Sequence, residues 1–276
     1  MNFLKHKKVG FIGTGKMGQA LIKTFVESGT FPKSNIYVTN RSPKKQEKVV
    51  QAYEVQGLKN NEELVETCDI VFLCMKPQDL PEALHPISQL FTEGQTVISL
   101  AAGISLDTLQ NILPEVKQIV RVMPNTPVRV RRGVVGYCLS DEARGSDEFI
   151  RDLLSPLGFV VAAEEGDMFE ALTVTCASGP GFIFELMMYW QDWLEEHGFQ
   201  PDEARRMTIQ TFLGTALLAE QAIHTDLSQL QDEVVSKKGV TYAGLESMRQ
   251  EEIERLLRIS FEKAAMRDRE LGKDKS

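Results

Sequence analysis

Between residues 8 and 163 the chain alternates between short apolar runs and segments whose apolar residues recur every three or four positions. Such alternation is typical of parallel strands joined by helices. The expected strands are Lys8–Ile12, Ile36–Thr39, Ile70–Met75, Thr96–Leu100 and Ile119–Val122, with weaker signals at Val134–Leu139 and Phe159–Ala162. The expected helices are Gly18–Ser28, Pro43–Tyr53, Asn61–Thr67, Asp79–Leu90 with an interruption at Pro86, Leu106–Ile112 and Asp147–Leu154. This spacing predicts a doubly wound α/β sheet.

From Gly166 onward the alternation stops and only helical periodicity remains. The expected helices are Asp167–Cys176, Phe182–His197, Pro201–His224, Ser228–Val235 and Tyr242–Arg269. The change in pattern places a domain boundary near Glu164–Gly166. We therefore predict an α/β domain of residues 1–164 followed by an all-helical domain of residues 165–276.

The expected helix Phe182–His197 carries more apolar surface than one solvated helix can expose. Its large side chains are Phe182, Phe184, Leu186, Met187, Tyr189, Trp190 and Trp193. A small helical domain can bury such a surface against a second copy of itself. We expect a homodimer or a larger homo-oligomer.

Composition narrows the functional classes. The 276 residues are 42% hydrophobic and 25% charged, which is typical of a globular protein. The net charge of −8 opposes binding to nucleic acid or to an anionic membrane. No apolar run approaches the length of a membrane span, and residues 1–8 lack the hydrophobic segment of a signal peptide, so we expect a cytoplasmic protein. The four cysteines form no C-x-x-C pair and the four histidines are scattered, so we expect no metal site.

The first expected strand leads into a glycine-rich turn and then a helix. Gly13, Gly15 and Gly18 form a G-x-G-x-x-G motif at this junction. The motif allows a tight turn, close approach of a pyrophosphate and tight packing of the helix, whose free amides attract the phosphates. We predict a Rossmann-type dinucleotide site that includes Gly13, Thr14, Gly15, Lys16, Met17 and Gly18.

The residues after the second expected strand indicate which dinucleotide is bound. NAD-selective sites usually have an acidic residue there, which binds the ribose 2′-hydroxyl. This chain has Asn40, Arg41 and Ser42 instead, followed by Lys44 and Lys45. A guanidinium suits a phosphate. We predict that NADP(H) is preferred and that NAD(H) is a weaker alternative.

Other strand ends contribute to the same predicted cleft, because ligands of open α/β sheets bind beyond the carboxyl ends of the strands. The candidate residues there are Met75, Lys76, Pro77, Ala101 and Asn125. Prolines after strands are also ordinary turn residues, so each segment alone is ambiguous.

Two segments of the helical part interrupt its periodicity. Ala177–Gly181 contains glycine and proline and marks a helix boundary. Val235–Leu245 reads as a loop entering a helix, whose free amides suit a small carboxylate. The second segment fits an ordinary capped helix equally well.

Taken together, these motifs resemble the pyrroline-5-carboxylate reductase family over nearly the whole chain. The resemblance follows the glycine turn, Val71–Pro77, Met123–Pro127, Ser178–Pro180, Ala204–Leu217 and Ser236–Leu245, in this order. The segments Met123–Pro127 and Ser236–Leu245 are specific to the family, whereas the glycine turn is not.

The resemblance implies reduction of the ring imine of 1-pyrroline-5-carboxylate to L-proline with hydride from NAD(P)H. It also implies a dimer formed through the helical domain. Family substrate positions fall on Ser236, Gly239, Val240 and Thr241. The loop amides and Ser236 would hold the carboxylate, and the Thr241 hydroxyl would lie near the ring nitrogen as the catalytic group. Asn61 and Lys76 match cofactor positions of the family.

One departure from the family pattern leaves alternatives open. The family usually has Pro-Gly-Gly-Thr where this chain has Lys237, Lys238, Gly239 and Val240. Lys238 replaces a glycine and Val240 replaces a hydroxyl, so substrate preference or turnover could differ. The alternatives are an enzyme for a related imino acid or β-hydroxyacid and an NADP(H)-binding protein with a regulatory, weakly active role.

Overall fold

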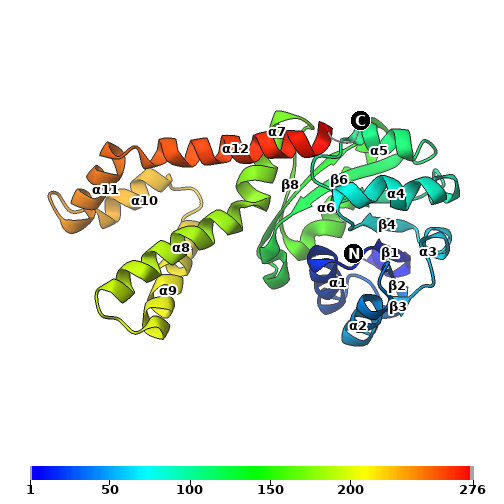
Figure 1. The fold of residues 1–276 in the computed structure, drawn as a ribbon, viewed down its shortest axis with the longest axis horizontal. Helices are drawn as coiled ribbons and strands as arrows, with labels where there is room; N and C mark the ends of the chain where they lie inside the picture. The colour runs from blue at the N-terminus through cyan, green and yellow to red at the C-terminus, as the bar shows by residue number, and fades with distance from the viewer. Residues whose placement is uncertain (1, 274–276) are drawn as a thin grey trace. The chain divides into compact units, whose positions relative to one another are not determined.

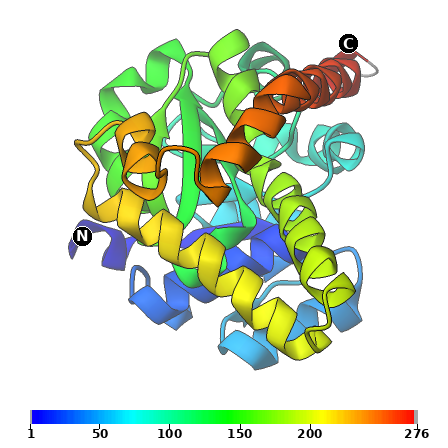
Figure 2. The same cartoon turned by 90° about the vertical axis from the view of Figure 1, so that its left-hand side faces the viewer.

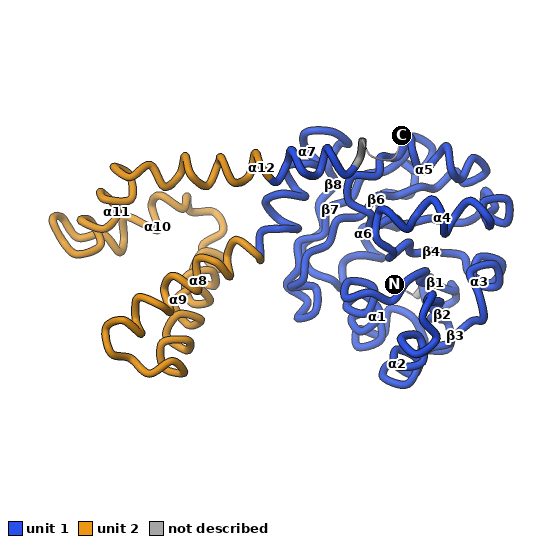
Figure 3. The backbone as a smooth tube through the Cα atoms, viewed as in Figure 1, with its two compact units in different colours: residues 1–180, 264–276 blue, residues 181–263 orange. Residues whose placement is uncertain are grey.

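The computed structural model describes residues 2–273, which form two compact units (Figure 3). The first unit extends to Pro180 and includes the end of the last helix from Ala264 onward. The second unit is Gly181–Lys263. The division between the two units therefore follows residue 180, whereas the sequence predicts a boundary between residues 164 and 165, where the sheet ends and the helical pattern begins. The boundary at 164/165 stays a prediction of where a helical domain starts.

The first unit contains an eight-stranded sheet in the order β3-β2-β1-β4-β5-β6-β7-β8 (Figure 1). Its strands are β1 (Val9–Ile12), β2 (Ile36–Thr39), β3 (Gln56–Gly57), β4 (Ile70–Leu73), β5 (Thr96–Ser99), β6 (Gln118–Pro124), β7 (Gly133–Leu139) and β8 (Gly158–Ala162). All neighbouring strands run parallel except β6 and β7. The predicted doubly wound α/β fold is confirmed.

Helices connect these strands. The α-helices of the first unit are α1 (Lys16–Ser28), α2 (Pro43–Tyr53), α3 (Asn61–Thr67), α4 (Leu80–Leu84), α5 (Leu106–Ile112), α6 (Asp147–Leu154) and α7 (Asp167–Leu172). Its 3₁₀-helices are η1 (Asn2–His6), η2 (Lys33–Asn35), η3 (Pro77–Asp79), η4 (His85–Leu90), η5 (Thr126–Val130), η6 (Asp141–Ser146) and η7 (Ser155–Leu157). A π-helix, η8 (Thr173–Ala177), follows α7.

The sheet has a hydrophobic core on each face, because successive side chains of a strand point to opposite faces. In β4, Ile70 and Phe72 belong to one core, whereas Val71 and Leu73 belong to the other. The first core includes Leu21 of α1, Val49 of α2 and Ile150 of α6. The second includes Leu64 of α3, Leu84 of α4 and Leu109 of α5. Burial on both faces explains why the strands read as continuous apolar runs.

Two features of the sheet differ from the sequence prediction. The pattern predicts parallel strands throughout, but β7 runs antiparallel to β6. Residues 125–132 join the two strands, and a parallel crossover needs a dozen or more residues. The strand β3 is not predicted, because both of its residues are exposed and give no hydrophobic signal.

The second unit is helical. Its helices are α8, which begins in the first unit (Gly179–Glu196), α9 (Pro201–Gln221), α10 (Leu227–Val234), α11 (Val240–Gln250) and α12, which ends in the first unit (Ile253–Lys273). Figure 2 shows the turn from α8 into α9. Within these two helices, the rings of Trp190 and Phe212 pack edge to face. The sequence pattern predicts a single helix over Tyr242–Arg269. The chain breaks instead at Glu251–Glu252, where Glu252 has a φ of 52°.

The second unit leaves much apolar surface uncovered. Its exposed side chains include Phe184, Tyr189 and Trp193 of α8, and Leu213 and Leu218 of α9. Within the part of this unit that the structure describes, only Ala204 and Thr208 are buried. The helices therefore cannot form an ordinary core from this unit alone.

One helical run meets the length and hydropathy of a membrane span, contrary to the expectation that no run does. It covers Asp167–Glu196, and 17% of its most apolar window is buried. These criteria alone are weak grounds for a membrane segment, because the core helix of a soluble protein passes the same test.

Candidate functional site

The turn between β1 and α1 has the backbone geometry of a phosphate-binding turn. Gly13 has a φ of 92°, which L side chains rarely adopt, and a Cβ there would lie 3.1 Å from the Cys74 carbonyl carbon. A Cβ at Gly18 would lie 2.8 Å from the Gly13 carbonyl oxygen. Gly15 is the N-cap of α1, and no side chain caps this end. The first amides of α1 are therefore available to an anion.

A pocket of about 570 Å³ opens beside this turn. The predicted cofactor residues that line it are Gly13, Thr14, Gly15, Asn40, Arg41, Asn61, Met75 and Lys76. They come from the ends of three neighbouring strands, β1, β2 and β4, and from the start of α3. The structure thus brings together the predicted residues at the carboxyl ends of these strands.

The pocket also has lining residues that the sequence did not indicate. They are Ile12, Thr39, Pro43, Lys59, Asn60, Glu62, Cys74, Asp79, Glu82 and Ala83. Lys59 and Asn60 follow β3, so their position depends on a strand without a hydrophobic signal. Asp79 lies in η3, and Glu82 and Ala83 lie in α4. In the sequence, only the preceding residues Met75–Pro77 pointed to this part of the pocket.

Asn40 is held by hydrogen bonds from three directions. Its side-chain Nδ2 donates to Thr14 Oγ1 at 2.7 Å, and its Oδ1 accepts from the Ser42 amide at 2.9 Å. Its own amide donates to Gln46 Oε1 at 2.9 Å. Behind it, Thr39 Oγ1 donates to Asn61 Oδ1 at 2.7 Å. These bonds order the loop that carries Arg41, whose side chain is exposed.

The other predicted cofactor residues do not line this pocket. Lys16, Met17 and Gly18 continue into α1, Ser42 precedes α2, and Pro77 begins η3. Ala101 is only 2% exposed and belongs to the hydrophobic core. The Asn125 side chain is buried, accepts from the Val134 amide at 2.9 Å and donates to the Cys176 carbonyl at 3.1 Å. The oxygen and the nitrogen of the Asn125 side-chain amide are therefore both bonded to backbone groups. A cofactor contact at Asn125 stays a prediction.

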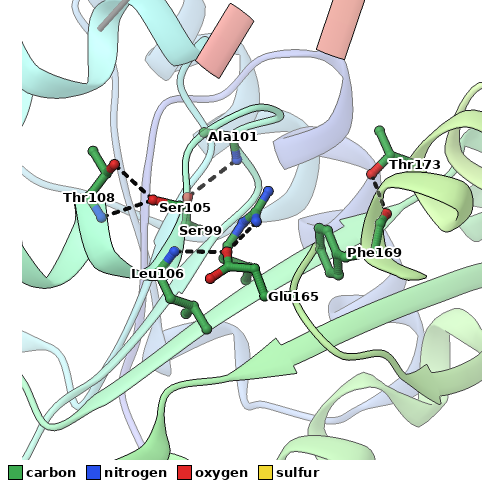
Figure 4. A network of polar contacts seen from close by, with 9 residues as sticks. Ser99, Ala101, Ser105, Leu106, Thr108, Glu165, Phe169 and Thr173 are labelled. Carbon is green, nitrogen blue, oxygen red and sulfur yellow. Dashed lines mark hydrogen bonds and ion pairs between the residues drawn. The ribbon is translucent and has the colours of Figure 1, made fainter. Parts of the chain in front are cut away.

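The loop after β5, which carries Ala101, is anchored at both ends (Figure 4). At its start the Ala101 amide donates to Ser99 Oγ at 3.3 Å. At its end the Ser105 side chain caps α5 by accepting from the Thr108 amide at 3.1 Å. Glu165 accepts from the Leu106 amide at 2.9 Å and pairs with the buried Arg121. These bonds fix the loop at the predicted cleft.

The cysteines near the sheet are unsuited to nucleophilic chemistry. Burial raises the pKa of the Cys74 thiol beside the glycine turn, and it raises the pKa of Cys68 and of Cys138 to about 12. Thiols this hard to ionise remain neutral near pH 7. Cys68 belongs to one hydrophobic core, and the partly buried Cys74 packs against the other. Among the described residues, no group of three histidine, cysteine or acidic side chains could hold a metal.

The predicted substrate residues lie in the second unit, between α10 and α11. The Gly239 amide donates to the Ser236 carbonyl at 2.9 Å, which closes a tight turn. A Cβ at Gly239 would lie 2.1 Å from Ser236 Oγ, so only glycine allows this side-chain position. Gly239 is the N-cap of α11, and no side chain caps it. The amides of Val240 and Thr241 therefore lack intrahelical partners.

Both departures from the family pattern have structural consequences in this turn. Lys238 has a φ of 59°, in the left-handed region that favours glycine. Val240 begins α11 with its side chain 93% exposed. Ser236 and Thr241 are also exposed. The chain thus keeps the tight turn although Lys238 stands where the family has a glycine, and Val240 presents an apolar side chain beside the free amides.

Comparisons with known proteins agree with these features. Residues 8–103 match the family model described as NADP oxidoreductase coenzyme F420-dependent, and residues 166–271 match the model for pyrroline-5-carboxylate reductase dimerisation. The chain is 32% identical to pyrroline-5-carboxylate reductase of Haemophilus influenzae, over 88% of this chain and 89% of that protein.

Solved structures show the same fold. A pyrroline-5-carboxylate reductase from Coxiella burnetii superposes with a TM-score of 0.88 at 27% identity, over 96% of this chain and 98% of that chain. The Plasmodium falciparum pyrroline carboxylate reductase, solved with NADP bound, superposes with a TM-score of 0.87 at 24% identity. That match covers 98% of this chain and 99% of the other.

Proposed function

Because the chain belongs to the pyrroline-5-carboxylate reductase family, we propose that it reduces the ring imine of 1-pyrroline-5-carboxylate to L-proline, with NADPH as the preferred reductant. The observation that carries this proposal is the open amino end of α11. Gly239 leaves it without a side-chain cap, and the turn bond to Ser236 places a hydroxyl beside the free amides. A small carboxylate suits such a helix start.

The residues beside the glycine turn fit a dinucleotide. Gly13 and Gly18 admit no side chain without strain or collision, and the uncapped start of α1 offers amides to a pyrophosphate. No acidic residue follows β2; Asn40, Arg41 and Ser42 stand there instead and would contact a 2′-phosphate. Asn61 and Lys76 line the same pocket and would contact the cofactor there. The bound cofactor supplies the hydride, and NADH would serve less well.

The residues of the α10–α11 turn bind and orient the substrate in this proposal. The amides of Val240 and Thr241 and the Ser236 hydroxyl hold the carboxylate, and Gly239 keeps the turn closed. The Thr241 hydroxyl donates a hydrogen bond to the ring nitrogen. That bond tightens as the nitrogen becomes an amine, so it stabilises the transition state more than the ground state. The proton reaches the nitrogen from solvent or through this hydroxyl.

We also propose that the enzyme works as a homodimer or larger homo-oligomer in the cytoplasm, without nucleic acid or a membrane as partner. The exposed side chains of α8 and α9 support the assembly, because a second copy would cover them. Burial against a second copy would also account for the apolar run Asp167–Glu196 without a membrane.

A second candidate function is an NADP(H)-binding family member with altered substrate or a regulatory, weakly active role. The observation that favours it is Val240, which presents an exposed apolar side chain where the family usually has a hydroxyl. In that case NADPH binds, but 1-pyrroline-5-carboxylate accelerates its oxidation only weakly.

The test is oxidation of NADPH that depends on 1-pyrroline-5-carboxylate, followed with the unmutated protein, Thr241→Ala and Thr241→Ser. We expect turnover in the unmutated protein and roughly a 10-fold or larger loss in Thr241→Ala if the hydrogen bond is worth over about 1.4 kcal/mol. Thr241→Ser should keep much of the activity. Ser247→Ala removes a hydroxyl from the same helix and serves as the matched control.

Melting temperatures of the same preparations separate catalysis from capping. A helix cap alone would lower stability and leave the kinetics of the folded protein unchanged. That result would discard the catalytic role of Thr241. Absence of substrate-dependent oxidation in the unmutated protein would contradict the reductase activity itself.

A further inference from the structure

Gln46 joins two walls of the dinucleotide pocket although it does not line the pocket itself. It lies in α2, half-buried, and its side-chain oxygen accepts from the Asn40 amide at 2.9 Å. Its Nε2 donates to the Leu58 carbonyl at 2.8 Å. One side chain thus connects the loop after β2 with the segment that follows β3.

Both connected segments lead directly to residues that line the pocket. Asn40 and Arg41 follow β2, and Lys59 follows Leu58. The Asn40 amide donates to Gln46, while the Asn40 side chain bonds to Thr14 and to the Ser42 amide. The backbone that carries Arg41 is therefore held on one side by the glycine turn and on the other by Gln46.

The bonds of Gln46 are separate from those that shape the pyrophosphate site. The glycine turn and the start of α1 depend on backbone conformation and on the close approach of Gly18 to Gly13. Gln46 contacts neither of them through any hydrogen bond that the described residues form. Loss of its side chain should therefore loosen the loop of Arg41 while leaving the amides of α1 in place.

We propose that Gln46 is a positioning residue for recognition of the 2′-phosphate and thereby sets the preference for NADP(H) over NAD(H). This proposal rests on the proposed NADP(H) site. The Arg41 side chain is long and exposed, so its contact with a phosphate costs conformational entropy. A loop that is already ordered reduces the entropy lost on binding, which is the usual benefit of preorganisation.

The experiment measures binding of two small probes by titration calorimetry, 2′,5′-ADP and 5′-AMP, which differ only in the 2′-phosphate. The variant Gln46→Met keeps the length of the side chain and removes both hydrogen bonds. We expect the dissociation constant of 2′,5′-ADP to rise roughly 5- to 10-fold, as loss of one or two hydrogen bonds suggests. The constant of 5′-AMP should change less than about twofold.

Gln51→Met is the matched control, because Gln51 lies in the same helix and its side-chain amide donates to the exposed Glu47. It should leave both constants unchanged. Gln46→Asn is the second variant. Its side chain stays polar, but it is one methylene too short to reach both Asn40 and Leu58, so it should show the same selective loss.

The outcomes are distinct. An equal loss for both probes, or no loss for either, in a variant with a native circular dichroism spectrum would overturn the role of Gln46. If the unmutated protein binds 2′,5′-ADP and 5′-AMP equally, the proposed 2′-phosphate site is wrong, and the proposed role of Gln46 is wrong as well. A selective loss in Gln46→Met and Gln46→Asn, with Gln51→Met unchanged, supports the proposal.

Discussion

Arg41 is the residue on which the choice of cofactor depends most directly. It follows β2 at the wall of the pocket, where an NAD-selective site usually has an acid. Its neighbour Asn40 is occupied with Thr14 and Ser42, so Asn40 serves mainly to order the loop. The guanidinium is therefore the main group available to a 2′-phosphate.

Replacing Arg41 by alanine should remove most of the preference for NADPH. Hydrogen bonds to charged groups are worth roughly 1.5–3 kcal/mol, so the dissociation constant of NADPH should rise about 10-fold or more. The constant of NADH should change little. Fluorescence titration of both cofactors measures this, with Lys48→Ala, an exposed lysine further along α2, as the basic control. Equal affinity for NADPH and NADH in the unmutated protein would refute the prediction.

The turn between α10 and α11 is the element in which this chain departs most from its family. The turn bond from Gly239 to Ser236 is kept, and the residue before Gly239 still requires a left-handed backbone. Lys238 adopts that conformation at the cost that any L side chain meets there. The geometry of the turn is thus retained at some expense of stability.

Lys238→Gly should therefore stabilise the protein. Relief of roughly 1–2 kcal/mol of backbone strain is offset by about 0.5–1 kcal/mol from the greater freedom of glycine in the unfolded chain. A net gain of about 0.5–1 kcal/mol in the free energy of unfolding is expected. Chemical denaturation at a fixed protein concentration measures it.

Lys237→Gly is the matched control, since it removes the same charge one residue earlier, where the backbone is not left-handed. It should destabilise the protein by about 0.5–1 kcal/mol. If both variants destabilise the protein to the same extent, strain at Lys238 is not the reason.

At the scale of the whole molecule, the main feature that a single chain leaves unexplained is the exposed apolar surface of the second unit. Phe184 is 61% exposed and Leu218 is 64% exposed in the single chain. Residues 166–271 match a dimerisation model, which agrees with the expectation drawn from α8. Burial of such side chains stabilises an assembly by roughly 1.5–3 kcal/mol each.

We expect light scattering at micromolar concentration to give at least twice the 31.0 kDa mass of one chain. The double variant Phe184→Glu, Leu218→Glu should shift the protein toward the monomer, because charges buried without partners are costly. Gln221→Glu, near the end of α9, adds a charge to the same helix as the control. A monomer in the unmutated protein would contradict the prediction.

Hydrophobic periodicity was sufficient for the α/β fold, the helical second part and most element positions, because burial of a strand or helix face leaves a local pattern. The glycine turn and the missing acid after β2 likewise indicated the kind of cofactor. Local patterns could not reveal the direction of β7, the edge strand β3 or the break at Glu252. They also could not show that Asn125 is committed to the backbone or that Gln46 spans from Asn40 to Leu58. These features depend on distances between segments far apart in the chain, which only tertiary packing determines.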